Sequence, residues 1–223
     1  MRIKVIAADS HPIVTVGIEQ VLGGHENVEL IGTATDSEEV LNLAATRGGD
    51  VLVTDPFAIQ VRSGFCRSVI PVIQHRYPGL RIVAHACIEN PAQLATMTRL
   101  GIAAVLHRFD TVGHLADAIK AAHFNARYLS PSLLRKSGSI ACLSDPDRAL
   151  TPRESEVLAH FVSGKTVCEI ARVLHRSKQT ISAHKMRAMV KLGISNDAEL
   201  FRLAFQDGFL SFCLSHQGGY AQC

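Results

Sequence analysis

Five short apolar runs, separated by stretches of helical periodicity, constrain the fold of the first 125 residues more than any other feature of the sequence. Each run is rich in Val, Ile, Leu or Ala and has the length of one buried strand. Strands that alternate with helices are typical of an α/β domain, here a doubly wound (βα)5 unit with a parallel sheet. The runs are Ile3–Ala8, Val28–Thr33, Val51–Thr54, Arg81–Ala86 and Ala103–Leu106.

The ends of these runs indicate where a functional crevice lies. In an open parallel sheet, ligands bind beyond the carboxyl ends of the strands. Asp9 follows the first run and Asp55 follows the third. We therefore expect the carboxylates of Asp9 and Asp55 to lie close together at one edge of the sheet.

From residue 150 the sequence changes to an all-α pattern of four short helices with clear start signals. Thr151 and Glu154 have the spacing of a capping box, and Thr166 and Glu169 repeat it. Ser177 is a typical N-cap residue for the helix that follows. These signals predict a second, helical domain.

Two of the helices, over 167–174 and 178–192, are separated by three residues, which is the spacing of a helix-turn-helix. Gly193 is placed to end the second of them. The segment Asn196–Glu199 carries the start signal of a fourth helix.

The chain divides into four segments. We predict a first domain over 1–125, a linker over 126–147, a helical domain over 148–210 and a tail over 211–223. The linker is rich in Ser, Gly, Pro and Asp, with a possible short helical turn at Pro131–Arg135.

Charge is distributed unevenly between the two halves. Residues 1–147 hold 13 basic and 14 acidic side chains, whereas residues 148–223 hold 10 basic and 6 acidic ones. A basic module beside a near-neutral one suggests nucleic-acid binding, although a solvated basic face fits the same count.

Composition and motifs exclude several classes of protein. No stretch approaches the roughly 20 apolar residues of a membrane helix, and the start lacks a secretory signal, so we expect no membrane association and a cytoplasmic location. The 6 cysteines and 11 histidines lack metal-finger spacing, so we expect free thiols, no metal and no cofactor. Without GxSxG, P-loop or GxGxxG motifs, we expect no enzyme.

The helix over 178–192 contains four basic residues and no acidic one. One face is expected to pack on the preceding helices. It carries Ile181, His184, Ala188, Met189 and Leu192. The other face is expected to be exposed. It carries Lys178, Gln179, Ser182, Ala183, Lys185 and Met186. The two closely spaced caps and the short turn favour DNA binding by this face over a merely solvated one.

Different residues of this face suit different parts of DNA. The N-terminal half of such a helix approaches base edges in the major groove. The small Ser182 and Ala183 allow close approach, and Ala183 is suited to a thymine methyl group. Lys185 is suited to guanine O6 or N7. Lys178 and the Thr180 hydroxyl are better placed for phosphates, which set register without reading sequence.

The last third of the chain resembles the LuxR-type helix-turn-helix of the NarL/FixJ response regulators. The matching motifs are LTPRE, EIA, TIS and KLGI followed by NDAEL. The resemblance implies a sequence-specific transcription regulator that binds double-stranded DNA as a homodimer, with the last helix, about Asp197–Gln206, among the dimer contacts. It assigns base-facing roles to Ser182, Ala183, Lys185 and Met186. Family members often carry a basic residue where Ser182 stands.

Residues 3–124 resemble a receiver domain, on the motifs AADSHPIVTVGI, VLVTDP, ENPAQL and GIAAVLHR. A receiver accepts a phosphoryl group from a histidine kinase, a phosphotransfer protein or a small phosphodonor. The resemblance makes Asp55 the phosphoacceptor candidate and Asp9 the first acid of a Mg²⁺-binding pair. Ser10 stands where the second acid belongs, Ala86 where a Thr or Ser hydroxyl belongs, and Arg108 where a lysine belongs.

These departures weaken the expected phosphorylation chemistry. Ser10 removes one negative charge from the Mg²⁺ site, so we expect Mg²⁺ at Asp9 and Asp55 only if the remnant site works. Ala86 cannot hydrogen-bond a phosphoryl oxygen. Arg108 keeps the charge of the lysine but has a planar fork. We therefore predict a pseudo-receiver with weak or no phosphorylation, held by an Arg108–Asp55 salt bridge.

Two other interpretations remain open at this point. One is a conventional response regulator that is phosphorylated on Asp55. The other is an auxiliary partner that forms a heterodimer with an intact regulator.

Three histidines lie near the same edge of the expected sheet. His11 is either a substitute ligand or, as we favour, the residue that opens the first helix beside Pro12. His85 and His107 end neighbouring strands. They form either a pH-responsive pair or, as we favour, ordinary strand-end packing.

Overall fold

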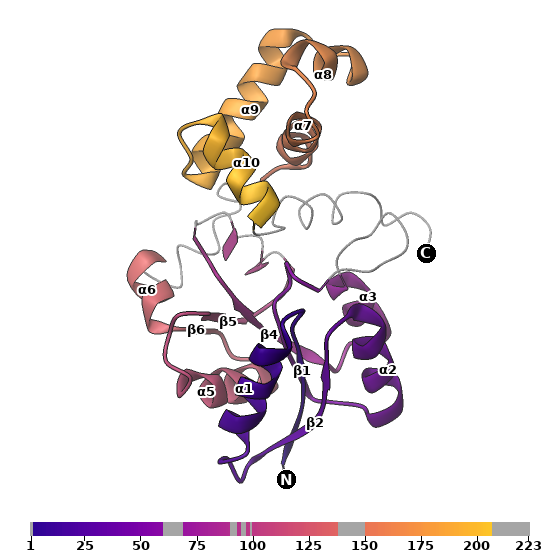
Figure 1. Cartoon of the computed structure of the whole chain (residues 1–223), viewed down its shortest axis with the longest axis vertical. Coiled ribbons are helices and arrows are strands. Elements are labelled where there is room, and N and C mark those ends of the chain that lie inside the picture. Colours follow the sequence, from indigo (N-terminus) through magenta and orange to yellow (C-terminus); the bar gives the residue numbers. More distant parts are fainter. Residues whose placement is uncertain are drawn as a thin grey trace.

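The chain forms two units in a computed structural model, a sheet with helices and a group of helices (Figure 1). The structure describes residues 2–59, 69–89, 93–94, 97–98, 100–137 and 150–206. Within these residues, no helix has both the length and the apolar character needed to cross a membrane.

The first unit contains a six-stranded sheet in which all paired strands are parallel. The strand order is β2-β1-β3-β4-β5-β6. The strands are β1 Ile3–Ala8, β2 Val28–Ala34, β3 Val51–Thr54, β4 Arg81–Ala86, β5 Ala104–His107 and β6 Tyr128–Leu129. The five predicted strands are confirmed. The second is one residue longer than expected, and the fifth begins and ends one residue later.

Helices cover both faces of the sheet, as the doubly wound pattern predicts (Figure 1). The helices are α1 Pro12–Leu22, α2 Ser37–Arg47, α3 Ile70–Arg76 and α5 His114–His123. α1 and α5 bury Ile18 and Ile119 in one core with the sheet. α2 and α3 bury Val40 and Ile73 in the core of the opposite face.

Residues 128–137 differ from the sequence expectation, because they are ordered elements rather than linker. β6 pairs with β5, and the Ser130 hydroxyl accepts a hydrogen bond from the His107 backbone N–H at 2.9 Å. α6 follows over Pro131–Ser137, where a short helical turn was expected. A two-residue strand is too short to produce an apolar run, so sequence periodicity missed it. Residues 138–149 and 207–223, with the predicted tail, lie outside the described residues.

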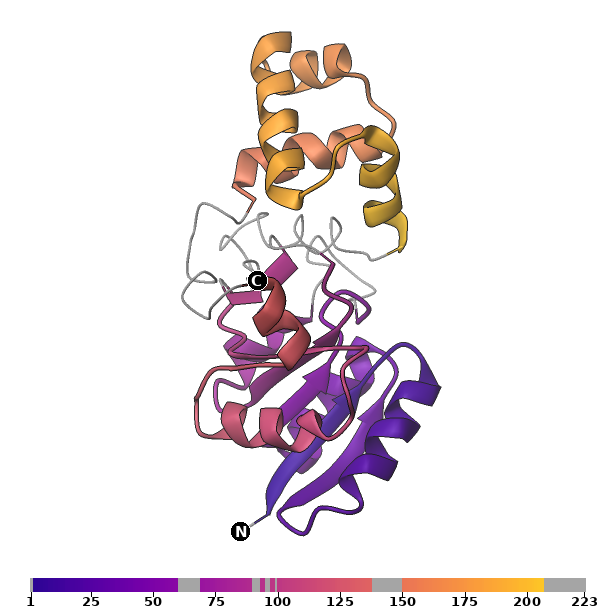
Figure 2. The same ribbon diagram turned by 90° about the vertical axis from the view of Figure 1, so that its left-hand side faces the viewer.

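The second unit is a separate group of helices (Figure 2). The helices are α7 Pro152–Val162, α8 Val167–Val173, α9 Lys178–Leu192 and α10 Asp197–Gln206. Both predicted capping boxes are present, and the Ser177 side chain accepts from the Thr180 backbone N–H. Gly193 ends α9 in the left-handed conformation with φ 66°, which glycine adopts without a Cβ clash. These caps place α9 immediately after α8, as in a helix-turn-helix.

Candidate nucleic-acid interface and carboxylate centre

Asp9 and Asp55 lie side by side, because β1 pairs with β3 and Ala8 is the register partner of Thr54. Both aspartates are buried, Asp9 to 1% exposure and Asp55 to 8%. Arg108, which follows β5, bridges them. Its Nη2 donates to Asp9 Oδ2 at 2.7 Å and to Asp55 Oδ2 at 2.9 Å. The structure therefore contains the expected Arg108–Asp55 salt bridge and extends it to Asp9.

The centre holds two carboxylates and one guanidinium. Burial raises the pKa of Asp55 above its ordinary value, because the charged form loses water. The Phe57 backbone N–H, which donates to Asp55 Oδ1 at 2.9 Å, and the Arg108 charge oppose this shift, while the Asp9 charge adds to it. The net shift is upward, so one guanidinium does not fully offset the burial of the second acid.

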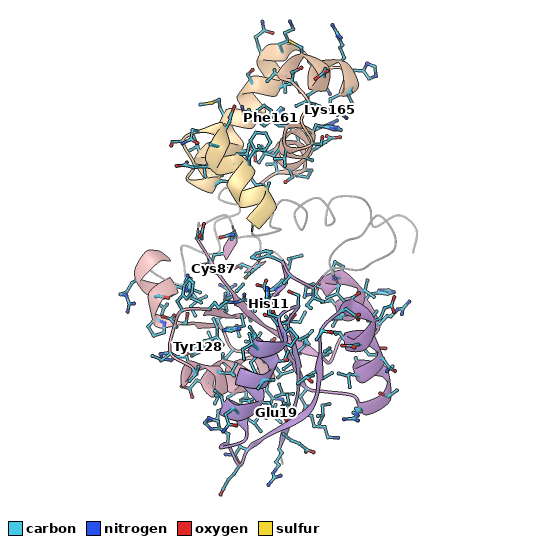
Figure 3. The ribbon with its side chains drawn as sticks, in the orientation of Figure 1. His11, Glu19, Cys87, Tyr128, Phe161 and Lys165 are labelled. Atoms are coloured by element: carbon cyan, nitrogen blue, oxygen red, sulfur yellow. The ribbon has the colours of Figure 1, made fainter. Side chains whose placement is uncertain are left out.

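His11 contacts the same centre through its main chain and its ring. Its backbone N–H donates to Asp9 Oδ1 at 2.8 Å, and its Nδ1 lies 3.0 Å from the same oxygen. Figure 3 shows His11 in the first unit, beside the start of α1. His11 is also the N-cap residue of α1, with Pro12 at the first helical position. Ser10 Oγ lies 3.2 Å from His11 Nδ1, in an exposed position.

The residues present do not fit a Mg²⁺ ion. Magnesium requires several oxygen ligands, usually including one or two carboxylates. Here each oxygen of both aspartates already lies within hydrogen-bond distance of an N–H donor. Over the described ranges, no group of three or more His, Cys, Asp or Glu side chains is arranged to hold a metal ion. The guanidinium of Arg108 supplies the positive charge of this centre instead.

His85 and His107 lie beside the centre, at the ends of β4 and β5. With Arg108 they line a groove of about 400 Å³ between α1 and α5. Burial lowers the pKa of His85, and the charges of Arg108 and His107 lower it further. This direction keeps His85 neutral at physiological pH. It supports strand-end packing over a pH-responsive pair.

The predicted faces of α9 are largely confirmed. The packed face buries Ile181, Ala188, Met189 and Leu192, and His184 is half-buried. The exposed face carries Lys178, Gln179, Ser182, Ala183 and Met186.

Lys185 does not lie on the exposed face, so its predicted position is wrong. Its Nζ is 2.6 Å from Asp197 Oδ1 of α10 and 3.6 Å from the centre of the Phe161 ring of α7. The side chain is only 14% exposed. Figure 3 labels Phe161, which projects from α7 within the helical unit. Lys185 is four residues after Ile181 and three before Ala188, and this spacing already places it on the packed face.

A second lysine of α9 is engaged in a contact that the sequence analysis missed. Lys191 Nζ lies 2.9 Å from Glu154 Oε2, and Glu154 is buried. Burial alone raises the pKa of Glu154, but the Thr151 N–H and Lys191 lower it below its ordinary value. The capping box at Thr151 therefore shares its carboxylate with an ion pair that ties α7 to α9. The capping spacing was a signal for Glu154, but nothing in the sequence indicated Lys191 as its partner.

The comparisons with known proteins agree with both units. Residues 148–204 match the family described as bacterial regulatory proteins, luxR family. The chain is 34% identical to the transcriptional regulatory protein RcsB of Escherichia coli K12 over 199 residues, which cover 89% of this chain and 92% of that protein.

Solved structures of RcsB resemble most of the chain. A structure of RcsB from Salmonella enterica serovar Typhimurium bound to the promoter P1flhDC with the phosphomimetic BeF3- is 32% identical, with a TM-score of 0.72. It covers 94% of this chain and 100% of that one. A structure of two RcsB dimers bound to two parallel DNAs is 32% identical, with a TM-score of 0.70 and coverage of 95% and 99%.

Proposed function

Because the chain belongs to the NarL/FixJ response regulators, the family of RcsB, we propose that it regulates transcription without requiring phosphorylation of its receiver-like unit. It is a DNA-binding transcriptional regulator of the two-component type. One observation carries the finer proposal: the Arg108 guanidinium already bridges the two aspartates on which phosphorylation would depend. We place its action in the cytoplasm and assign it no catalytic reaction of its own.

The exposed face of α9 supports the assignment of the DNA-contacting residues. Ser182, Ala183 and Met186 are exposed in the middle of the helix and are proposed to face the bases. Lys178 and Thr180, at its start, are proposed to contact phosphates, together with the positive helix N-terminus. Lys185 is removed from the base-facing set, because it is committed to Asp197 and Phe161.

Binding as a homodimer is the expected mode, because one solved RcsB structure contains dimers on DNA. We propose that α10 contributes to the contact between the DNA-binding units. Two such units would place two copies of α9 in successive major grooves.

The receiver-like unit lacks the groups that bind and report a phosphoryl group. Ala86 is buried at the end of β4 and offers no hydroxyl. Ser10 points to His11 rather than to the aspartates. We propose that Arg108 fixes one state of this unit, in place of the phosphoryl group and Mg²⁺.

Phosphate incorporation tests this proposal. The full chain is incubated with acetyl phosphate and Mg²⁺, alongside Asp55→Asn and a triple variant Ser10→Asp, Ala86→Thr, Arg108→Lys that restores the family's residues. We expect incorporation in the triple variant and none in the wild-type chain. Incorporation by the wild-type chain that is lost in Asp55→Asn would establish a conventional regulator instead.

A gel shift with the purified chain alone tests independent DNA binding. We expect a specific complex whose affinity falls steeply with salt, because Lys178 and the N-terminus of α9 are proposed to contact phosphates. Poor binding alone, rescued by an intact regulator of the same family, would favour the auxiliary heterodimer.

A further inference from the structure

The exposed face of the recognition helix α9 is uncharged where it should meet the bases. Gln179, Ser182, Ala183 and Met186 are exposed along its first three turns. Met186 is 58% exposed, and Val190, one turn later, is 74% exposed. Exposed methionine and valine on one helix face leave apolar area in water, which costs free energy unless a partner covers it.

Two of the four cations of this helix are committed to the protein itself. Lys185 is held by Asp197 and the Phe161 ring, and Lys191 is held by Glu154. Arg187 is exposed, and its Nε donates to the Ala183 carbonyl oxygen at 3.3 Å. The commonest base-specific contact is a bidentate Arg or Lys on guanine. Lys185 and Lys191 are therefore not available for such a contact with guanine.

The major groove offers one apolar group to a side chain, the 5-methyl of thymine. Ala183 and Met186 are three residues apart and therefore neighbours on one helix face. Building on the proposed function, we infer that Ala183 and Met186 read thymine methyl groups, and that the operator carries thymines where α9 enters the groove. The apolar area left exposed in the free protein is then covered by DNA.

Replacement of thymine by deoxyuridine tests the inference, because it removes the methyl group and leaves base pairing intact. An operator is first selected from a random duplex library with the full chain. Each thymine of a half-site is then replaced in turn, and the Kd is measured at fixed salt. We expect about a four-fold weakening for each methyl group that is buried in the complex.

Variants identify the side chain that reads the methyl group. Met186→Gln keeps the length and charge of the side chain but favours adenine over thymine. At the thymine position that Met186 reads, we expect this variant to have the same Kd for the thymine and the deoxyuridine duplex. Val16→Thr, an exposed apolar position of α1, is the matched control and should retain the full deoxyuridine effect. Because Met186 is exposed, we expect its replacement to leave the fold intact, which circular dichroism checks.

The outcomes separate the inference from the proposed function. A chain that selects no sequence and shows no salt-dependent binding lacks the proposed function. A chain that binds its operator but ignores every deoxyuridine overturns the inference alone. The inference is also overturned if Met186→Gln and Ala183→Ser both keep the full deoxyuridine effect, since another group then reads the methyl.

Discussion

The two units each bury an ion-pair centre, but the balance of charge differs between them. In the sheet unit, Asp9 and Asp55 share the single guanidinium of Arg108. In the helical unit, Glu154 alone faces Lys191 and also accepts from the Thr151 backbone N–H. The pKa of Asp55 is raised and that of Glu154 is lowered. Burial raises the pKa of both carboxyls. In Glu154 the Thr151 hydrogen bonds and Lys191 outweigh it, whereas in Asp55 the Phe57 N–H and Arg108 do not.

The two centres therefore depend on their cations to different degrees. In the sheet unit two acids share one guanidinium, so the arrangement of that centre depends on Arg108. A matched pair joined to a capping box fixes two helices in one arrangement. The sheet unit instead holds an unbalanced centre, in which Arg108 is the shared cation.

Removal of Arg108 should have the largest effect. Arg108→Ala leaves two buried carboxylates without a cation, so we expect the free energy of unfolding of the sheet unit to fall by about 3–5 kcal/mol. Hydrogen exchange of the backbone amides of β1 and β3 measures the loss in the sheet unit separately from the helical unit. Arg108→Lys, which keeps the charge, should lose less. Equal losses in both variants would show that shape rather than charge holds the centre.

Glu154→Gln should weaken the helical unit by about 2 kcal/mol, because it removes a charge-assisted hydrogen bond from a buried position. Its folded pKa is lowered, so its contribution is complete above the ordinary value of 4.5 and is lost as pH falls through the folded pKa. Urea unfolding at pH 7 and pH 3 measures both effects, with Arg153→Gln as an exposed control. If the free energies of unfolding of the wild-type chain and Glu154→Gln differ as much at pH 3 as at pH 7, the ion-pair explanation is contradicted.

Asp55→Asn should raise the stability of the sheet unit at pH 7, by on the order of 1 kcal/mol, because it removes a charge that the folded state disfavours. The folded pKa of Asp55 is raised, so its contribution is complete below 3.8 and is lost as pH rises through the folded pKa. As pH rises from 3.8 through the folded pKa of Asp55, the wild-type chain should lose this contribution to its stability, whereas the variant should not. Thermal unfolding across this pH range measures the difference. A less stable variant at pH 7 would mean that Arg108 outweighs the burial cost.

The fold was largely predictable from sequence because its signals are local. Apolar runs and helix caps are written within a few residues of the elements that they define, and the bounds of α9 and α10 were expected correctly. β6 was missed because two residues, Tyr128 and Leu129, form a strand only through pairing with β5. Such pairing is a tertiary effect that periodicity does not register.

The carboxylate centre was predictable in part. Parallel pairing places the ends of β1 and β3 together, so the approach of Asp9 to Asp55 followed from the order of the runs. The double bridge by Arg108 depends on one long side chain that reaches from the end of β5 to the aspartates after β3 and β1, which no spacing rule determines. The charge of Lys185 favours a DNA contact, but its helical position places the side chain on the packed face.

Lys185→Met should have the smallest effect and contrasts most directly with Met186→Gln. It removes a partly exposed ion pair and a cation–π contact, and methionine still fills the space beside Phe161, so we expect a loss of less than about 1 kcal/mol. Base preference should be unchanged, because Lys185 faces α7 and α10 rather than the groove. Operator selection with the variant and the wild-type chain compares their preferences. A lost preference for guanine at one position would return Lys185 to the base-reading set and place its ammonium in the major groove.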